Sequence, residues 1–233
     1  MREWVKSIGL ALGLFLVIRT FLVQAFKIPT GSMEDTLLIG DFLLVNKLVY
    51  GSSTPRSLPL VDGNLPQLHL PGYDEPERGN IVVFEYPLDR SVDYVKRCVA
   101  LPGDTVEMHD KVLYINHRPQ EEPFVLHGDS KIYNSEPGGR IHPDFVWQRQ
   151  YITDQARQKF GGNYVSTRDN FGPLLVPPGK YFCLGDNRDF SSDSRYWGFV
   201  DRELIKGRPL ILYFSWDRNH WLVRLNRIGK LIG

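Results

Sequence analysis

Two side chains of this chain have the chemistry for a hydrolysis that uses a serine nucleophile. Ser32 follows Thr30 and Gly31, and the glycine lets a ligand approach the backbone closely. Lys96 lies in the run YVKRCV (94–99), which is apolar apart from Lys96 and Arg97. Apolar surroundings disfavour a charged amine and lower its pKa, so that it can act as a general base for a hydroxyl group. On these residues alone, a turn serine and a solvated strand-edge lysine are the simpler interpretation.

Strand geometry predicts which neighbouring side chains share a face with Lys96 and with Ser32. Along a strand, alternate side chains share a face, so Lys96 and its neighbour Arg97 must meet different surroundings, while Cys98 shares the face of Lys96. Thr30 and Ser32 would likewise share one face of an extended segment. One hydroxyl could then attack a carbonyl group while the other helps to hold the oxyanion.

A third group of polar residues lies in the run GDNRDFSSDSRYWGFV, residues 185–200. Its acidic and basic side chains alternate closely among serines, and such charge-assisted hydrogen-bonding groups can fix a rigid loop around a site. The alternative is a solvated turn of mixed charge. The aromatic residues at 196, 197 and 199 favour the rigid loop.

Short apolar runs bounded by Pro and Gly predict the elements that hold these residues. Strands are predicted at 79–86, 93–101, 179–184 and 210–216, with a hairpin over 106–116 and a strand, turn and strand over 37–50. The stretch 51–78 reads as a long loop. These elements predict a mostly β protein with an antiparallel β catalytic core. Residues 118–172 are polar and irregular and predict an inserted second β region.

The first 26 residues change the class of protein. Residues 7–26 include fourteen apolar residues, and a helix of about 20 residues spans the hydrocarbon core of a bilayer. A cleaved signal peptide and a buried core helix are the alternatives to a retained single-pass anchor. Arg2 and Lys6 precede the run and favour an inside N-terminus, whereas Arg19 would have to snorkel or pair.

The expected location is therefore the inner (cytoplasmic) membrane, with the catalytic domain on the extracytoplasmic (periplasmic) side. The basic, amphipathic tail 218–233 could lie on an anionic membrane surface or pack as a terminal segment.

The amino-acid composition limits which partners and cofactors are expected. Lys plus Arg number 28 and Asp plus Glu 27, so no basic field predicts a nucleic-acid partner. Cys98 and Cys183 are the only cysteines, too few for a disulfide scaffold. They could pair in an oxidising compartment, but two free, buried thiols are expected. The six histidines form no recognised ligand motif, so neither a metal nor an organic cofactor is expected.

Four stretches, taken in order, resemble the type I signal peptidases, which are membrane-anchored serine endopeptidases. They are IPTGSMEDTL (28–37), GNIVVFEYP (79–87), DYVKRCVALPGD (93–104) and the run 185–200. The resemblance implies a Ser-Lys dyad, with Ser32 as nucleophile and Lys96 as general base. It also implies an oxyanion hole formed by the Thr30 hydroxyl and the Ser32 backbone.

Further roles are implied by the same resemblance. Ser191 would orient the lysine amine, and Asp193 with Arg195 would form a supporting ion pair. The residues implied to surround the lysine are Phe84, Tyr94 and Cys183, and those implied to line shallow pockets for small substrate side chains are Ile28, Met33, Leu37 and Val95. Two positions depart from the family pattern, since Asp35 stands where Pro is usual and Phe190 where Asn is common.

The expected organisation is a cytoplasmic tail (1–6), a transmembrane anchor (7–26), a catalytic β core (27–117 and 173–217, with the loop 51–78), the inserted region (118–172) and the tail (218–233).

The expected function is cleavage of signal peptides from exported preproteins after small residues of the A-x-A type, with the export machinery and the lipid bilayer as partners. The alternatives are a specialised maturation peptidase with the same dyad, for example in conjugation, a self-cleaving Ser-Lys repressor, and an inactive membrane-anchored peptide-binding module.

Overall fold

The computed structural model describes residues 2–18, 22–53, 69–134 and 140–232. The chain forms two compact units. Unit 1 comprises Met1–Pro29, Ile39–Pro76 and Lys206–Gly233, and unit 2 comprises Thr30–Leu38 and Glu77–Ile205. The short segment Thr30–Leu38 therefore belongs to a different unit from the residues on either side of it. It brings Ser32 into the unit that also holds Lys96.

Unit 1 begins with the helix α1 (Arg2–Val17), which is followed by the strand β1 (Val23–Lys27). The predicted helix over 7–26 was therefore too long. Residues 23–27 pair antiparallel with β2 (Asp41–Asn46), from Val23 opposite Asn46 to Lys27 opposite Phe42. A short apolar run is compatible both with a strand and with the end of an apolar helix. Here the pairing with β2 makes these residues a strand. Arg19 lies outside the described residues.

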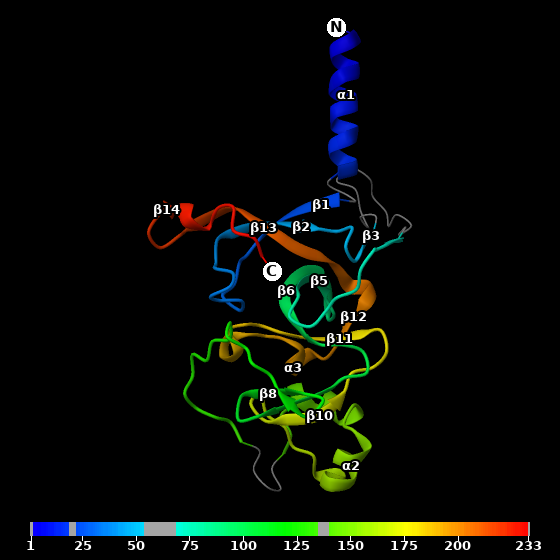
Figure 1. Cartoon of the computed structure of the whole chain (residues 1–233), viewed down its shortest axis with the longest axis vertical. Helices are drawn as coiled ribbons and strands as arrows, with labels where there is room; N and C mark the ends of the chain where they lie inside the picture. Colours follow the sequence, from blue (N-terminus) through cyan, green and yellow to red (C-terminus); the bar gives the residue numbers. More distant parts are fainter. Residues whose placement is uncertain (1, 19–21, 54–68, 135–139, 233) are drawn as a thin grey trace. The chain divides into compact units, whose positions relative to one another are not determined.

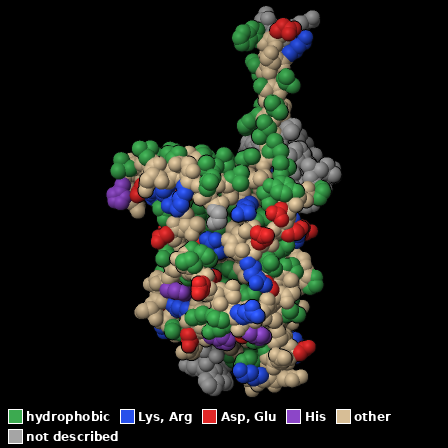
Figure 2. Space-filling view, in the orientation of Figure 1, with side chains coloured by type: hydrophobic (Ala, Val, Ile, Leu, Met, Phe, Trp, Pro, Cys, Tyr) green, Lys and Arg blue, Asp and Glu red, His purple; other side chains and the backbone are tan. Residues whose placement is uncertain are grey.

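The side chains of α1 are exposed and mostly apolar. Figure 2 shows hydrophobic side chains along the helix, with charged ones gathered at its free end. The exposed apolar residues are Trp4, Val5, Ile8, Leu10, Leu12, Leu14 and Phe15. In the part of the chain that the structure describes, none of the helices combines the length and the apolar character needed to cross a membrane.

The rest of unit 1 is a small antiparallel sheet. β2 pairs with β13 (Ile205–Asp217), and the end of β13 pairs with β14 (Leu222–Val223). β3 (Gly51–Ser53) pairs with β4 (His69–Pro71). Most of the long loop predicted at 51–78 lies outside the described residues.

The C-terminal tail of unit 1 packs against this sheet. It contains a 3₁₀ turn, η6 (Leu225–Arg227). The buried Arg227 pairs with the fully buried Asp41 at 2.6 Å, and Leu231 bridges to Ile211. This agrees with the packed terminal segment, although Trp221, Leu222, Leu225 and Leu231 stay exposed.

Unit 2 contains two antiparallel sheets. The first has the strand order β5 (Ile81–Tyr86), β6 (Asp89–Ala100), β11 (Lys180–Leu184) and β12 (Val200–Asp201). Figure 1 shows β5 and β6 as a strongly curled pair. The 3₁₀ turn η5 (Arg202–Leu204) follows β12.

The second sheet has the order β10 (Phe171–Leu175), β7 (Thr105–His109), β8 (Val112–Ile115) and β9 (Arg118–Pro119). The predicted hairpin is confirmed. Its turn residues, Asp110 and Lys111, have φ values of 48° and 72°, the positive values that a two-residue hairpin turn needs.

The inserted region 118–172 was wrongly predicted to be β. Within its described residues, only β9 and the start of β10 are strand, and the rest contains η2 (Pro143–Gln150), α2 (Asp154–Phe160) and η3 (Gly161–Asn163). Thr153 caps α2 by accepting a hydrogen bond from the Ala156 N–H at 3.3 Å, which stabilises a helix start. This short helix buries only Ala156, so it has no apolar period long enough to reveal it. The mostly antiparallel β fold class itself is confirmed.

Candidate active site

The structure brings the two candidate catalytic side chains together. Lys96 Nζ lies 2.6 Å from Ser32 Oγ, in a hydrogen bond that joins the middle of β6 to the segment Thr30–Leu38. Lys96 is 4% exposed and Ser32 is 8% exposed. A hydroxyl and an amine at this distance can exchange a proton without first moving.

Ser32 lies in a turn and not in the predicted extended segment. The Glu34 N–H donates to the Gly31 carbonyl at 3.2 Å, and the Leu37 N–H donates to the Met33 carbonyl at 2.7 Å. A Cβ at position 31 would lie 2.9 Å from the Glu34 carboxylate, so the Glu34 side chain would have to move for any other residue to stand there. The shared strand face expected for Thr30 and Ser32 is therefore wrong, and Thr30 is exposed.

Asn187 holds this turn from the loop 185–200. Its backbone N–H donates to the Ser32 carbonyl at 3.1 Å, and its side-chain amide donates to the Gly31 carbonyl at 3.2 Å. Gly185 lies equally close, since a Cβ there would be 2.5 Å from the Ser32 carbonyl oxygen and 2.2 Å from Ser191 Oγ. Sequence reasoning missed Asn187, although its place in the run GDNRD was the available signal.

Aromatic rings lie near the Lys96 amine. Its amine lies 5.1 Å from the centre of the Tyr94 ring, and Phe84 packs against Tyr94 at 6.3 Å between ring centres. Burial lowers the pKa of Lys96 from 10.5 to about 8, although Asp193, Cys183 and Asp186 partly oppose the fall. The amine is thus half neutral near pH 8, which is what a general base requires.

The pKa of Lys96 predicts the pH dependence of the reaction. Below about pH 8, the amine is protonated and cannot accept the hydroxyl proton. We therefore expect kcat/KM to rise about tenfold per pH unit below that value and to level off above it. Initial rates measured from about pH 5 to about pH 10 check this expectation, because this range brackets the pKa. A profile that is flat between about pH 6 and 9 would contradict Lys96 as the base.

Arg97 faces away from Lys96, as the strand alternation predicts. Its guanidinium pairs with Asp186 through two hydrogen bonds, of 2.8 and 2.6 Å. Asp186 also accepts a hydrogen bond from the Thr36 hydroxyl at 2.6 Å. The buried Asp186 therefore links the strand that carries the base to the turn that carries the nucleophile. The roles of Thr36, Arg97 and Asp186 were not predicted.

Asp193 and Arg195 form a second ion pair, which is fully buried. Arg195 Nε donates to Asp193 Oδ1 at 2.8 Å, and both residues are 0% exposed. Burial alone would raise the pKa of Asp193, but the Arg195 guanidinium outweighs it and lowers that pKa. Asp193 also accepts a hydrogen bond from the Gly185 N–H at 3.2 Å, so the pair braces the glycine that touches Ser32.

Ser191 reaches the site without a direct contact to the amine. Among the described residues, the hydrogen bonds of Lys96 go to Ser32 Oγ and to the Val95 carbonyl, and none goes to Ser191. Ser191 is 5% exposed, lies beside Gly185 and helps to lower the pKa of Asp193. Its role in orienting the lysine stays a prediction.

The four residues expected to line substrate pockets are mostly buried. Met33 and Leu37 are 1% and 0% exposed, and both lie in the turn segment of unit 2. Val95 is half-buried in β6. Ile28 is 3% exposed and belongs to unit 1, where its N–H donates to the Asp41 carbonyl at 2.8 Å.

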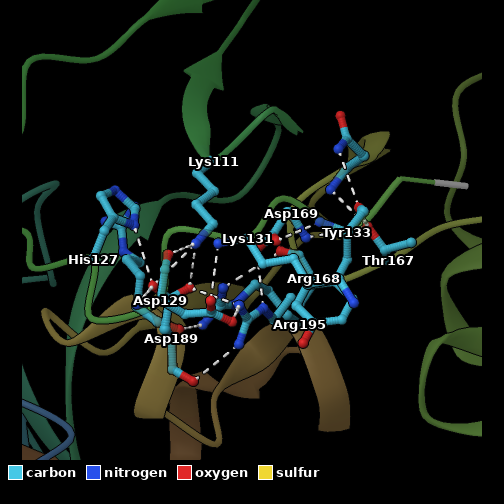
Figure 3. Close-up of polar contacts among 12 residues, drawn as sticks. Lys111, His127, Asp129, Lys131, Tyr133, Thr167, Arg168, Asp169, Asp189 and Arg195 are labelled. Carbon is cyan, nitrogen blue, oxygen red and sulfur yellow. Dashed lines mark hydrogen bonds and ion pairs between the residues drawn. The ribbon is translucent and has the colours of Figure 1, made fainter.

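The loop 185–200 is fixed by a polar network, so the solvated turn is wrong (Figure 3). The Asp189 carboxylate accepts hydrogen bonds from Lys111 Nζ at 3.0 Å and from the Asp129 N–H at 2.9 Å, and it pairs with Arg168 at 3.1 Å. Phe190, which departs from the family pattern, is 67% exposed beside this network.

The two cysteines lie opposite each other on neighbouring strands, Cys98 on β6 and Cys183 on β11. Both thiols are free and buried, as expected. Burial raises the pKa of the Cys183 thiol, which keeps it in its unreactive protonated form.

The chain is similar to known proteins over most of its length. A family model described as signal peptidase, peptidase S26, matches residues 1–214. A signal peptidase I of Pseudomonas fluorescens is 37% identical over 243 residues, which cover 98% of this chain and 78% of the relative. A signal peptidase I of Pseudomonas aeruginosa is 36% identical over 248 residues, with coverage of 98% and 78%.

Among solved structures, a signal peptidase I of Enterococcus faecalis V583 is 30% identical, with a TM-score of 0.37 over 58% of this chain and 97% of that one. The residues matched by the family model include Ser32, Lys96 and the whole of the loop 185–200. The chain therefore belongs to the signal peptidase family, peptidase S26.

Proposed function

We propose that this chain is a membrane-bound serine endopeptidase that removes signal peptides from exported preproteins. The observation that carries the proposal is the buried hydrogen bond of 2.6 Å between Lys96 Nζ and Ser32 Oγ. Membership of the signal peptidase family supplies the substrate class. Ser32 is the nucleophile, and the neutral Lys96 amine is the general base.

The reaction proceeds in two halves. Lys96 accepts the hydroxyl proton while Ser32 Oγ attacks the carbonyl carbon of the scissile bond. The oxyanion is held by the Ser32 backbone N–H and the Thr30 hydroxyl. Lys96 then gives its proton to the leaving amine, and an ester to Ser32 remains. Water, deprotonated by the same lysine, hydrolyses this ester and releases the signal peptide.

The substrate lies extended beside the segment before Ser32 and pairs through its main chain. Met33 and Leu37 lie in the same turn segment as the nucleophile, and both are buried. Shallow pockets bounded by Met33, Leu37 and Val95 accept only small side chains, as an A-x-A cleavage site provides.

The exposed, apolar helix α1 anchors the chain in the inner membrane, with the catalytic unit on the periplasmic side. The exposed apolar side chains of α1 support this proposal, as do the basic residues Arg2 and Lys6 before the apolar run. Protease added outside spheroplasts should digest the part that follows the anchor. Full protection of that part in intact spheroplasts would contradict the proposed orientation.

The activity is tested with a purified preprotein that carries an A-x-A site, incubated with the full chain in detergent or lipid. We expect a mature chain whose first residue follows the last Ala, as read by mass spectrometry. A matched preprotein with Phe in place of that last Ala should stay uncut, because the pocket next to Ser32 is small. Absence of cleavage of the A-x-A preprotein would favour a specialised maturation peptidase or a peptide-binding module.

A further inference from the structure

A cavity of about 420 Å³ lies in unit 2, the unit that also holds Ser32 and Lys96. It is lined by Tyr86, Leu88, Asp144, Asp189, Phe190, Ser191, Ser192, Tyr196 and Trp197. Leu88 and Phe190 are 72% and 67% exposed. Two large apolar side chains thus stand in water at the edge of a cavity, where burial by a ligand would be favourable.

The cavity is reached from Lys96 through two stacked rings. The Lys96 amine lies 5.1 Å from the centre of the Tyr94 ring, and Tyr94 stacks on Tyr86 at 4.5 Å between ring centres. Tyr86 lines the cavity, and so does Ser191, which lies beside the glycine that touches the Ser32 carbonyl. The cavity therefore begins two side chains, Tyr94 and Tyr86, away from the general base.

The chemistry of the leaving group determines which part of a substrate passes this point. In the cleavage proposed above, on which this inference rests, the acyl part is bonded to Ser32 while the leaving amine takes its proton from Lys96. The chain that follows the leaving amine must therefore run past the lysine. We propose that this cavity is a specificity site for the mature protein, and that it binds the side chain of the first or second residue after the cleaved bond.

The lining selects a bulky apolar side chain, and an aromatic one above all. Tyr86, Tyr196, Trp197 and Phe190 provide ring faces and edges, which pair well with another aromatic ring. The Asp189 carboxylate is compensated by Lys111 and Arg168. Asp144, whose side chain is 53% exposed, adds negative charge to the lining, so an acidic side chain is disfavoured there.

One wall of the cavity, which includes Phe190, is held in place by contacts within the protein before any substrate binds. A Cβ on Gly128 would lie 2.5 Å from the Phe190 ring, so the ring rests against the bare backbone of that glycine. Arg168 donates to the Asp189 carbonyl at 3.2 Å (Figure 3), and Arg195 donates to the Arg188 carbonyl. Because the wall is already ordered, little conformational entropy is lost on binding.

The test uses preproteins that share one A-x-A acyl side and differ only in the first two residues of the mature chain. The series has Ala-Ala, Phe-Ala, Ala-Phe and Ala-Glu at these positions. We expect one of the Phe substrates to exceed Ala-Ala by about tenfold in kcat/KM, the scale of one apolar side chain in a pocket. The Ala-Glu substrate should be cleaved more slowly than Ala-Ala.

The double variant Phe190→Ala/Leu88→Ala should remove this preference, so that the Phe and Ala-Ala substrates are cleaved with equal kcat/KM. Leu175→Ala is the matched control, since Leu175 is an exposed apolar residue (48%) on β10 and does not line the cavity. It should keep both the activity and the preference.

Two results overturn the proposal while leaving the proposed function intact. One is cleavage of all four substrates by the wild-type chain at the same rate. The other is a preference for Phe that survives in the double variant. Failure of the wild-type chain on every substrate in the series would instead overturn the proposed function, and this inference with it.

Discussion

Replacing Ser32 by alanine is expected to lower kcat for preprotein cleavage by at least about 10⁴-fold, and Lys96→Met should do the same. Ser32 supplies the atom that bonds to the substrate, and Lys96 supplies and removes every proton in the cycle. Single-turnover cleavage of an A-x-A preprotein measures the loss. Thermal unfolding should be little changed, because both replacements remove a polar group without adding bulk.

Matched controls make this result specific. Ser91 and Lys159 are exposed residues of the same types in unit 2, and Ser91→Ala and Lys159→Met should keep wild-type rates. Full activity in Lys96→Met would show that another group is the base and that the proposed mechanism is wrong. Loss of activity in the controls would show that the assay does not report on the dyad.

The second large effect is on stability. Asp193→Asn is expected to lower the free energy of unfolding by about 3–5 kcal/mol, because it leaves the Arg195 guanidinium buried without its counter-charge. Arg195→Met should cost a similar amount for the converse reason. Urea unfolding of each variant, followed by tryptophan fluorescence, measures the change.

An exposed ion pair of the same unit provides the control. Arg90 and Glu203 lie 2.9 Å apart, with side chains 44% and 68% exposed, and Glu203→Gln should cost less than about 1 kcal/mol. A double variant that removes both Asp193 and Arg195 should lose less than the two single losses added together. Strict additivity would mean that the two buried groups do not depend on each other.

Local patterns were sufficient to predict much of the β core. The strands around Lys96 contain short apolar runs between turn residues, and β5, β6 and the β7–β8 hairpin lie close to where they were expected. The predictions fail where contacts with residues distant in the sequence determine the local structure. Residues 23–26 are as apolar as the helix before them, and pairing with β2 makes them a strand.

For the candidate site, residue types were more informative than predicted geometry. A lysine among apolar residues of a predicted strand and a serine after a glycine pointed to the dyad, and the structure places the two side chains in contact. The turn at Ser32 was not foreseen because its shape depends on Asn187 and Gly185, which are distant in the chain. Thr36 and Asp186 are 150 positions apart, so no local pattern in a single sequence indicates that they form a hydrogen bond.

That remoteness has a consequence for how the protein becomes active. The bonds that assemble the site join residues separated by 64 positions at Ser32–Lys96, 150 at Thr36–Asp186 and 156 at Gly31–Asn187. Contacts of such high contact order carry a large loop-closure entropy and form late in folding. Asp186 and Asn187 also emerge from the ribosome long after Ser32. A nascent or partly folded chain therefore contains a serine and a lysine but no working peptidase, and proteolytic activity starts only when the folded unit is complete.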